Sequence, residues 1–355
     1  MPSTRFAWRI DAAGSLDRLT LREEPLAPPG PGEARIAVRA VGLNFADLFA
    51  CLGLYSATPA GSFVPGLEAA GVVESLGPAL ADRPERLRVG TRVMALTRFG
   101  GYATHLNCDT RYLEPVPDGW SDAEAAAYPV QALTAWYGLV ALGAARPGSV
   151  VLVQSAAGGV GLQALAILAR LGCQPVAVVG TPQKVDFLAD RAGLPRSQIV
   201  LRERLGYEAA LDAALGALDA RGFDVVLDAV LGDWFRPAFA RLAPEGRYVL
   251  FGAAEFMTTG RRPAWPRLAW QWLRRPRLDP LAMISANRGL LAFNLIWLWE
   301  SVGRVPAAYA ALAALDLPAP HVGARHPFGA AHAALAELQS GRTVGKSVLY
   351  IDAPA

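Results

Sequence analysis

The chain has 355 residues and a mass of 37.6 kDa, and 53% of its residues are hydrophobic while 18% are charged. This composition excludes an intrinsically disordered chain and, at roughly 100–200 residues per domain, favours two domains. The 34 Lys and Arg nearly balance the 31 Asp and Glu, so a nucleic-acid-binding protein is not predicted despite a pI of about 8.9. No run reaches the roughly 18–20 apolar residues of a membrane span, and we expect a cytoplasmic protein.

Residues 5 to about 128 have the pattern of an irregular β-rich domain. Short alternating strands are expected at residues 34–41 and 68–76, and breakers such as Pro28-Pro29-Gly30-Pro31-Gly32 separate the strands. The final part of the chain contains a strand-like run at residues 346–351 that can fold back on this domain. We therefore assign residues 1–126 and 299–355 to one domain.

The middle of the chain has a different sequence pattern, in which Ala- and Leu-rich helical stretches alternate with Val-rich runs. This alternation is typical of βαβ units on a parallel sheet. It predicts an α/β fold class, with a Rossmann-type, doubly wound parallel sheet at residues 127–298 beside the β-rich domain. The six predicted strands are residues 150–153, 175–179, 198–201, 224–227, 248–251 and 290–297.

A glycine-rich turn, Ala156-Ala157-Gly158-Gly159-Val160-Gly161, follows the first of these strands and precedes a helix predicted at residues 162–171. The turn matches an A-x-G-x-x-G dinucleotide fingerprint, in which Gly158 leaves room for a pyrophosphate and Gly161 lets the helix pack closely on the strand. The N–H groups of the helix N-terminus attract phosphate. A glycine turn can also be a plain connection, but the order strand, turn, helix favours a cofactor site formed by Ala157, Gly158, Gly159, Val160 and Gly161.

The residues at the end of the second predicted strand indicate which of the two nicotinamide cofactors, NADH or NADPH, the chain binds. NAD enzymes place an Asp or Glu there, whereas this chain has Gly180-Thr181-Pro182-Gln183-Lys184, which contains no acid. Lys184 can bind a 2′-phosphate, and Arg202, just after the third strand, can reach the same phosphate or stack on adenine. Either residue could instead be an ordinary solvated cation. We predict NADPH as the cofactor, held in part by Gly180, Thr181, Lys184 and Arg202.

The cysteines and histidines do not predict a metal site. Cys51, Cys108 and Cys173 are far apart in the sequence, so neither a disulfide framework nor a thiolate zinc cluster is expected. The four histidines lack H-E-x-x-H spacing, and structural or solvent-exposed roles are expected for them.

Several motifs together resemble the medium-chain dehydrogenase/reductase superfamily, specifically its zinc-independent quinone oxidoreductase branch. Within that branch, Asn287-Arg288 and Phe293-Asn294-Leu295 are most similar to the vesicle amine transport protein homologues. The resemblance covers nearly the whole chain and implies that the β-rich domain is GroES-like. Its other markers are Gly42-Leu43-Asn44-Phe45-Ala46-Asp47, Gly53-Leu54-Tyr55, Pro65-Gly66-Leu67-Glu68-Ala69-Ala70-Gly71, Gly90-Thr91-Arg92-Val93, the glycine turn and Val344-Gly345-Lys346.

The resemblance also implies a set of site residues. Asn44 and Tyr55 become the catalytic candidates, since the matching residues face nicotinamide and substrate, and Asp47 is expected to be a structural partner. Where the zinc enzymes of this superfamily have ligands, this chain has Asn44, Leu67 and Val130-Gln131, so no catalytic zinc is expected. Further cofactor contacts are implied for Asn44, Gln131, Thr134, Gly252, Ala253, Phe293, Leu295 and Lys346.

The sequence therefore predicts a metal-free reductase that transfers hydride from NADPH to a quinone or an α,β-unsaturated carbonyl. Two alternatives stay open: an enoyl-thioester reductase of fatty-acid or polyketide assembly, and a cofactor-binding interaction protein with little turnover. The apolar run at residues 290–297 would be an edge of the parallel sheet, which predicts a homodimer that pairs two such edges.

One further segment is unusual in composition. Residues 256–278 contain six arginines, three tryptophans and no acidic residue, and a helix is expected just after them at residues 280–287. A solvated helical insertion is the favoured interpretation, ahead of a substrate lid and of a basic, aromatic membrane-surface patch.

Overall fold

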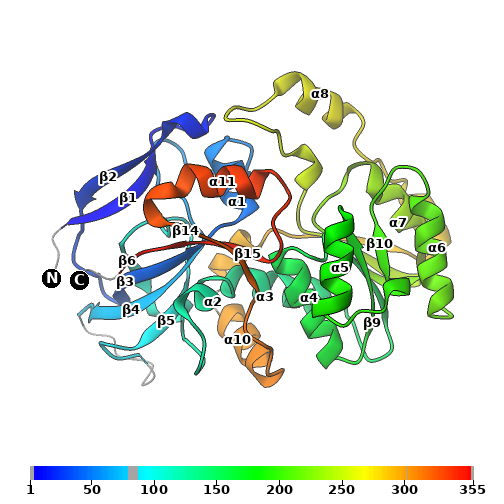
Figure 1. Cartoon of the computed structure of the whole chain (residues 1–355), viewed down its shortest axis with the longest axis horizontal. Helices are drawn as coiled ribbons and strands as arrows, with labels where there is room; N and C mark the ends of the chain where they lie inside the picture. Colours follow the sequence, from blue (N-terminus) through cyan, green and yellow to red (C-terminus); the bar gives the residue numbers. More distant parts are fainter. Residues whose placement is uncertain (1–3, 79–86, 302, 353–355) are drawn as a thin grey trace.

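The computed structural model describes residues 4–78, 87–301 and 303–352. Two sheets lie side by side along the long axis of the molecule, with helices in the seam between them (Figure 1). Within the described residues, none of the helices combines the length and the apolar character needed to cross a bilayer. The domain boundaries assigned from the sequence stay a prediction.

The first half of the molecule is built on a seven-stranded sheet of order β14-β15-β3-β4-β5-β7, in which β6 also pairs with β3. A separate ribbon, β1 with β2, covers one side of it. The strand predicted at the end of the chain does return to this sheet, since β15 pairs antiparallel with β3. The strands of this half are β1 Thr4–Ile10, β2 Leu19–Pro25, β3 Glu33–Gly42, β4 Glu68–Leu76, β5 Arg92–Leu96, β6 His105–Asp109, β7 Leu113–Pro115, β14 Val322–Pro327 and β15 Lys346–Tyr350. Its helices are α1 Phe45–Cys51, α2 Asp122–Ala126, α3 Pro129–Trp136, α10 Arg304–Ala314 and α11 Ala331–Gln339.

The second half is a six-stranded parallel sheet of order β10-β9-β8-β11-β12-β13 with helices on both faces, which confirms the predicted Rossmann-type fold (Figure 1). All five residues of β8 are buried, as expected for a central strand covered on both faces. The strands are β8 Val150–Gln154, β9 Gln174–Val179, β10 Ile199–Leu201, β11 Phe223–Asp228, β12 Leu242–Leu250 and β13 Gly289–Ala292; the helices are α4 Gly159–Arg170, α5 Pro182–Arg191, α6 Tyr207–Ala217, α7 Phe235–Ala240, α8 Trp265–Leu273 and α9 Pro280–Ala286.

The sixth strand is shorter than the sequence predicts. We expected strand at residues 290–297, but β13 ends at Ala292 and a 3-10 helix, η7, occupies Leu295–Glu300. The physical reason is Asn294, whose side chain accepts from the backbone N–H of Ile296 and caps the helix. The strand prediction was therefore wrong beyond Ala292, and Phe293 and Leu295 lie on the loop and helix that follow.

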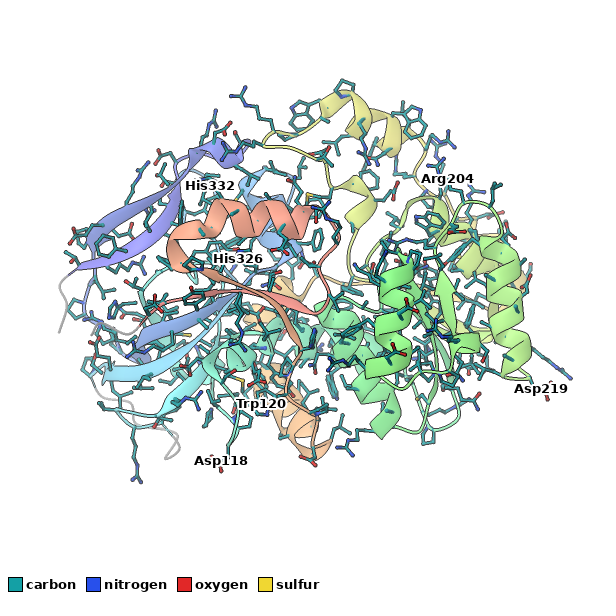
Figure 2. All side chains as sticks on the ribbon, viewed as in Figure 1. Asp118, Trp120, Arg204, Asp219, His326 and His332 are labelled. Carbon is teal, nitrogen blue, oxygen red and sulfur yellow. The ribbon has the colours of Figure 1, made fainter. Side chains whose placement is uncertain are left out.

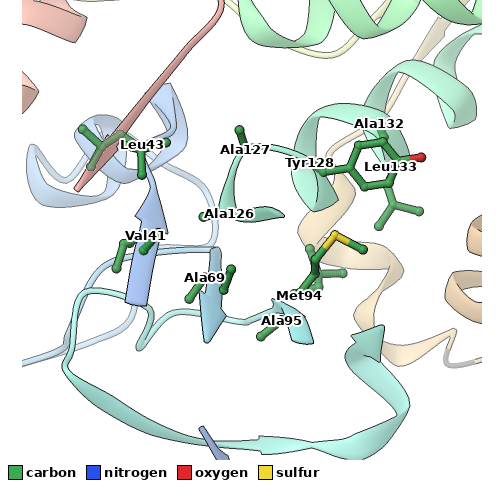
Figure 3. Close-up of a cluster of buried hydrophobic side chains, with 14 of the residues drawn as sticks. Val41, Leu43, Ala69, Met94, Ala95, Ala126, Ala127, Tyr128, Ala132 and Leu133 are labelled. Carbon is green, nitrogen blue, oxygen red and sulfur yellow. The ribbon is translucent and has the colours of Figure 1, made fainter. Parts of the chain in front are cut away.

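The two halves share a continuous apolar core across the seam. Helices α2 and α3 connect them, and Tyr128 and Leu133 of this connection belong to the same cluster of buried side chains as Val41, Ala69 and Met94 (Figure 3). The backbone approaches closely here, because a β-carbon at Gly42 would lie 2.2 Å from the carbonyl oxygen of Ala126. This contact fixes the end of β3, and therefore the residues that follow it, against the helices of the seam.

Candidate active site at the seam

A buried polar cluster of four side chains lies where the two halves meet. Asn44 follows β3, Glu68 begins β4, Gln131 is on α3 and Lys346 begins β15. Lys346 Nζ lies 2.7 Å from Asn44 Oδ1 and 2.6 Å from Glu68 Oε1, and Gln131 Nε2 donates to Asn44 Oδ1 over 2.8 Å. The sequence separates Asn44 from Lys346 by 302 residues, but the pairing of β15 with β3 brings them together.

The amide of Asn44 has partners on both of its atoms. Its oxygen accepts from Lys346 and Gln131, while its nitrogen donates to Glu68 Oε1 and to the carbonyl oxygen of Gly42. The resemblance implies that Asn44 faces nicotinamide and substrate, to which its amide N–H could donate. In this arrangement, Asn44 would have to give up one of its existing hydrogen bonds to donate to either group. Lys346 differs in this respect, because its ammonium has three N–H donors and uses two of them on Glu68 and Asn44.

Glu68 is a site residue that the sequence analysis did not select. Its side chain is fully buried, and its second oxygen accepts from the backbone N–H of Val130 over 2.8 Å, which ties β4 to α3. A carboxylate at this depth is tolerated when it is paired and hydrogen-bonded, and Lys346 supplies the opposite charge. The signal in the sequence was an acid directly before an apolar run, Glu68 before Ala69-Ala70-Gly71-Val72-Val73.

The positions at which the zinc enzymes of this superfamily have metal ligands carry side chains of other kinds in this chain. Asn44 and Gln131 do converge, and the cation that they and Glu68 surround is the ammonium of Lys346, while Leu67 is a buried apolar side chain. Among the described residues, no group of three or more His, Cys, Asp and Glu side chains could hold a metal ion. His326 contacts Glu337 and His332 contacts the carbonyl oxygen of Leu19, both in the first half of the molecule (Figure 2).

Asp47 lies one turn beyond Asn44, on α1, and is fully buried. Its Oδ2 accepts from the backbone N–H of Asn44 and from the Tyr102 hydroxyl, while Oδ1 is buried without a hydrogen-bond partner. Burial raises the pKa of Asp47 to about 7, although the N–H of Asn44 and the charge of Lys346 act in the opposite direction. Asp47 therefore fixes the backbone of Asn44.

Tyr55 reaches across the seam to the other half of the molecule. Its hydroxyl donates to Asn294 Oδ1 over 2.7 Å, and Asn294 follows β13. Burial raises the pKa of Tyr55 to about 12, so the phenol stays protonated and remains a hydrogen-bond donor near neutral pH. Asn294 was noted only as part of a family motif, and its role in holding Tyr55 depends on a contact between residues 239 positions apart.

The glycine turn lies between a strand and a helix, in the order that its sequence predicts. Helix α4 begins at Gly159, three residues earlier than expected, and a β-carbon at Gly161 would lie 2.5 Å from Ala156 Cα. A β-carbon at Gly159 would lie 2.8 Å from Gln131 Oε1, so the polar cluster is in contact with the turn. Gly158 forms a bridge with Gly345, next to Lys346, which joins the two features directly. Ala157 accepts from the N–H of Gly345, and Val160 lies in the first turn of α4.

Lys184 and Arg202 form a positively charged pair at the far end of this turn. Lys184 Nζ donates to the carbonyl oxygen of Gly341, and burial together with the charge of Arg202 lowers the pKa of Lys184. Arg202 lies 3.5 Å from Ser155 Oγ and over the Trp234 ring, and burial lowers its pKa as well. Two partly buried cations that repel each other fit a phosphate ligand, because an anion would relieve both penalties. Gly180 and Thr181 lie beside them, with Gly180 against the Arg202 guanidinium.

The remaining predicted cofactor residues lie on α3, in the loop after β12 and in the segment after β13. Thr134 is buried on α3, one turn beyond Gln131. Gly252 and Ala253 follow β12, where a β-carbon at Gly252 would lie 2.9 Å from the carbonyl oxygen of Ala229. Phe293 packs edge-on against Tyr137, and Leu295 begins η7.

Comparisons with known proteins agree with this geometry. A family model for the alcohol dehydrogenase GroES-like domain matches residues 30–118, and one for zinc-binding dehydrogenase matches residues 201–349. The chain is 32% identical over 350 residues to the human synaptic vesicle membrane protein VAT-1 homolog, with 96% of this chain and 85% of that one covered.

Two solved structures extend the comparison. The quinone oxidoreductase from Thermus thermophilus, also solved with NADPH, is 31% identical with a TM-score of 0.76, and 97% of this chain and 99% of that one are covered. The CurK enoyl reductase is 25% identical with a TM-score of 0.78, at 98% and 99% coverage. The chain therefore belongs to the medium-chain dehydrogenase/reductase superfamily, in its quinone oxidoreductase branch, and is an oxidoreductase.

Proposed function

We propose that this oxidoreductase is an NADPH-dependent reductase of quinones or α,β-unsaturated carbonyls that works without a metal ion. The observation that carries the proposal is that a protonated tyrosine and a buried ammonium both lie at the seam, where the glycine turn contacts the residue next to Lys346. A reduction of this kind needs hydrogen-bond donors at the oxygen on which negative charge develops.

The cofactor side of the proposal depends on the glycine turn and the basic pair. The N-terminus of α4 would hold the pyrophosphate, and Lys184 with Arg202 would hold the 2′-phosphate that distinguishes NADPH from NADH. Bound NADPH would supply hydride. Gln131 contacts both Asn44 and the turn, so it transmits the position of the turn to the polar cluster.

The substrate side depends on Tyr55 and the polar cluster. Tyr55 would turn its hydroxyl from Asn294 to the substrate oxygen and stabilise the developing enolate or quinolate by hydrogen bonding. Its raised pKa matches a donor that keeps its proton in the resting enzyme. Lys346 would add a fixed positive charge behind Asn44, in a place where burial keeps the local dielectric low.

An enoyl-thioester reductase is the second candidate, supported by the likeness to an enoyl reductase. It would use the same cofactor and the same tyrosine on a conjugated C=C bond. A third possibility, a cofactor-binding protein with little turnover, differs from both in its rate rather than in its fold.

The test is steady-state oxidation of NADPH against a panel of quinones, enones and enoyl thioesters, with elemental analysis of the same preparation. We expect turnover with quinones or enones and less than about 0.1 zinc per chain, as an order of magnitude for a metal-free enzyme. Preference for enoyl thioesters would select the second candidate. Binding of NADPH without turnover on any acceptor would select the third, and activity lost with one bound zinc would reject the metal-free proposal.

A further inference from the structure

Two contacts with the first half of the molecule lie one turn apart at the start of η7, the 3-10 helix Leu295–Glu300. The Tyr55 hydroxyl donates to Asn294, the residue that caps this helix. The guanidinium of Arg98 lies 5.9 Å from the centre of the Trp297 ring. The backbone N–H of Trp297 donates to the carbonyl oxygen of Asn294 over 3.1 Å, which closes the turn between them. A 3-10 helix rises about 2.0 Å per residue, so the two contacts are separated by about 6 Å along its axis.

The loop that carries Arg98 is held in place by the residues on either side of it. The hydroxyl of Thr97 donates to the carbonyl oxygen of Gly66 over 2.9 Å. Phe99 has a φ of 71°, and its ring packs edge-on against Phe63 with 5.5 Å between the ring centres. A residue with a side chain keeps this left-handed backbone only when its surroundings stabilise it, and such residues cluster at functional sites. Arg98 is therefore presented to η7 from a fixed backbone.

Both members of the second contact are accessible to solvent. Arg98 is exposed, and Trp297 is 51% exposed. A guanidinium is charged near neutral pH, and its planar set of N–H donors matches the oxygens of a carboxylate or a phosphate. The face of a tryptophan ring attracts a planar conjugated molecule. A hydrogen-bond donor, Tyr55, is thus followed one turn along η7 by an aromatic face and a cation.

We propose that Arg98 and Trp297 form a substrate subsite, and that the acceptor is an enone or quinone that carries an anionic group, a carboxylate or a phosphate. This inference rests on the proposed function, in which Tyr55 donates to the reacting carbonyl oxygen. The conjugated plane would lie against Trp297, and Arg98 would bind the anionic group about 6 Å away. For a conjugated keto acid, one alkene carbon would gain hydride from NADPH and the other a proton from water, which yields the saturated keto acid and NADP+.

The test compares an acid with its own ester, trans-benzoylacrylic acid and the methyl ester, as acceptors for NADPH. The pair differs in charge but not in the conjugated enone. We expect Arg98→Gln to lower kcat/KM for the acid by about tenfold and to change that for the ester by less than about twofold, as for the loss of one charge-assisted hydrogen bond. In the native protein, the KM of the acid alone should rise with salt, because ions screen the exposed guanidinium. The phosphonate that corresponds to the acid shows which of the two anions is preferred.

Two variants control for charge and for fold. Arg92 begins β5, whereas Arg98 follows its end, and Arg92 pairs with Asp122 at 2.7 Å. Arg92→Gln therefore removes the same charge away from η7 and should leave the reduction of the acid unchanged. Arg98→Lys keeps a cation and should retain part of the preference for the acid. Thermal unfolding of each variant measures whether Arg98 stabilises the fold. If Arg98 only holds the two halves together, the acid and the ester will lose activity equally in Arg98→Gln.

Binding of the saturated products separates this inference from the proposed function. Calorimetry in the presence of NADP+ measures the affinities of benzoylpropionic acid and its methyl ester, and it needs no turnover. Stronger binding of the acid, lost in Arg98→Gln, would support the subsite even if no acceptor is reduced, in which case only the proposed function fails. Reduction of enones with the same ratio of acid to ester in the native protein and in Arg98→Gln would overturn the subsite and keep the proposed function. An equal loss for both compounds, or no preference for the acid in either experiment, would overturn the subsite as well.

Discussion

The hydroxyl of Tyr55 is the single group whose removal best tests the proposed chemistry. Tyr55→Phe should lower kcat by about 10²–10³-fold and leave NADPH affinity intact, since losing one donor to a developing oxyanion costs about 2.7–4 kcal/mol. Asn294→Ala keeps the phenol but removes its partner, so a smaller loss is expected. Single-turnover rates with a quinone, together with NADPH titration, measure both effects. An unchanged rate in Tyr55→Phe with a lower melting temperature would make Tyr55 a structural aromatic residue instead.

Lys184 tests the choice of cofactor. A charge-assisted hydrogen bond contributes about 1.5–3 kcal/mol, so Lys184→Ala should weaken NADPH binding by about one to two orders of magnitude. NADH lacks the 2′-phosphate, and its affinity should change little. Titration of both cofactors by calorimetry provides the comparison, with Lys184→Arg as the variant that keeps the charge. Equal losses for the two cofactors would mean that Lys184 acts only through its bond to Gly341.

The raised pKa of Asp47 leads us to expect that the stability of the protein depends on pH. Its pKa is about 7 in the folded protein and about 3.8 when unfolded, so the folded state binds the proton more tightly between these values. The stability that Asp47 contributes is therefore present at low pH and lost as pH rises through about 7. The free energy of unfolding of the native protein relative to Asp47→Asn should fall by about 2–3 kcal/mol between pH 5 and pH 8. Urea unfolding at four pH values measures it, and a constant difference would contradict the raised pKa.

The sequence predicted the members of the site better than their contacts. Asn44, Gln131 and Lys346 were selected through motifs, and the structure does bring them together. The bond from Tyr55 to Asn294 was not predicted, because the register of two distant segments decides it. The saturation of the Asn44 amide could not be predicted for the same reason, since three of its four partners come from distant segments.

At the scale of elements, the turn between β8 and α4 depends on the absence of a side chain at Gly161. Gly161→Ala would place a β-carbon 2.5 Å from Ala156 Cα, so the turn must shift. We expect a loss of about 1–3 kcal/mol in stability and weaker binding of NADPH. Gly216→Ala is the control, because nothing lies within 4 Å of a β-carbon there and an exposed helical alanine should add about 0.4–1 kcal/mol. Equal effects of the two substitutions in thermal unfolding would contradict this account.

Periodicity predicted where elements lie but not where the last strand ends. The apolar run from Leu290 onward continues past Ala292 without a break in composition, so hydrophobicity alone gives no boundary. The strand ends because Asn294 caps the next helix, and an asparagine between apolar residues is a weak signal when it is read without its partners. Each of the other five strands of this sheet ends on a polar residue or is followed within two residues by a glycine or a polar residue, and the sequence placed their C-terminal ends near the observed ones.

At the scale of the whole molecule, β13 is the edge of the parallel sheet and pairs only with β12 among the described strands. We predict that two copies of the chain join these edges across a two-fold axis. The N–H of Phe293 donates to the carbonyl oxygen of Leu250, so the alternation along the strand directs the N–H of Ala292 outward. Ala292→Pro should therefore remove a bond to the second copy while the bonds to β12 survive.

Light scattering at several micromolar concentrations measures this contact. The native protein should have twice the mass of 37.6 kDa, and Ala292→Pro should lower the mass toward one chain. Ala292→Ser keeps the N–H and serves as the control. A mass of one chain for the native protein, unchanged as its concentration rises, would reject the dimer.

The closure of the active site by β15 also has a consequence for the order in which the molecule folds. The parallel sheet forms from neighbouring βαβ units, whereas Asn44 and Lys346 meet only after a loop of about three hundred residues has closed. Contacts between distant segments are slow to form, so the glycine turn becomes structured while Lys346 is still free. We therefore expect a newly made chain to form the glycine turn before Lys346 becomes buried. We expect the proposed reductase activity to be gained late in folding, when β15 pairs with β3.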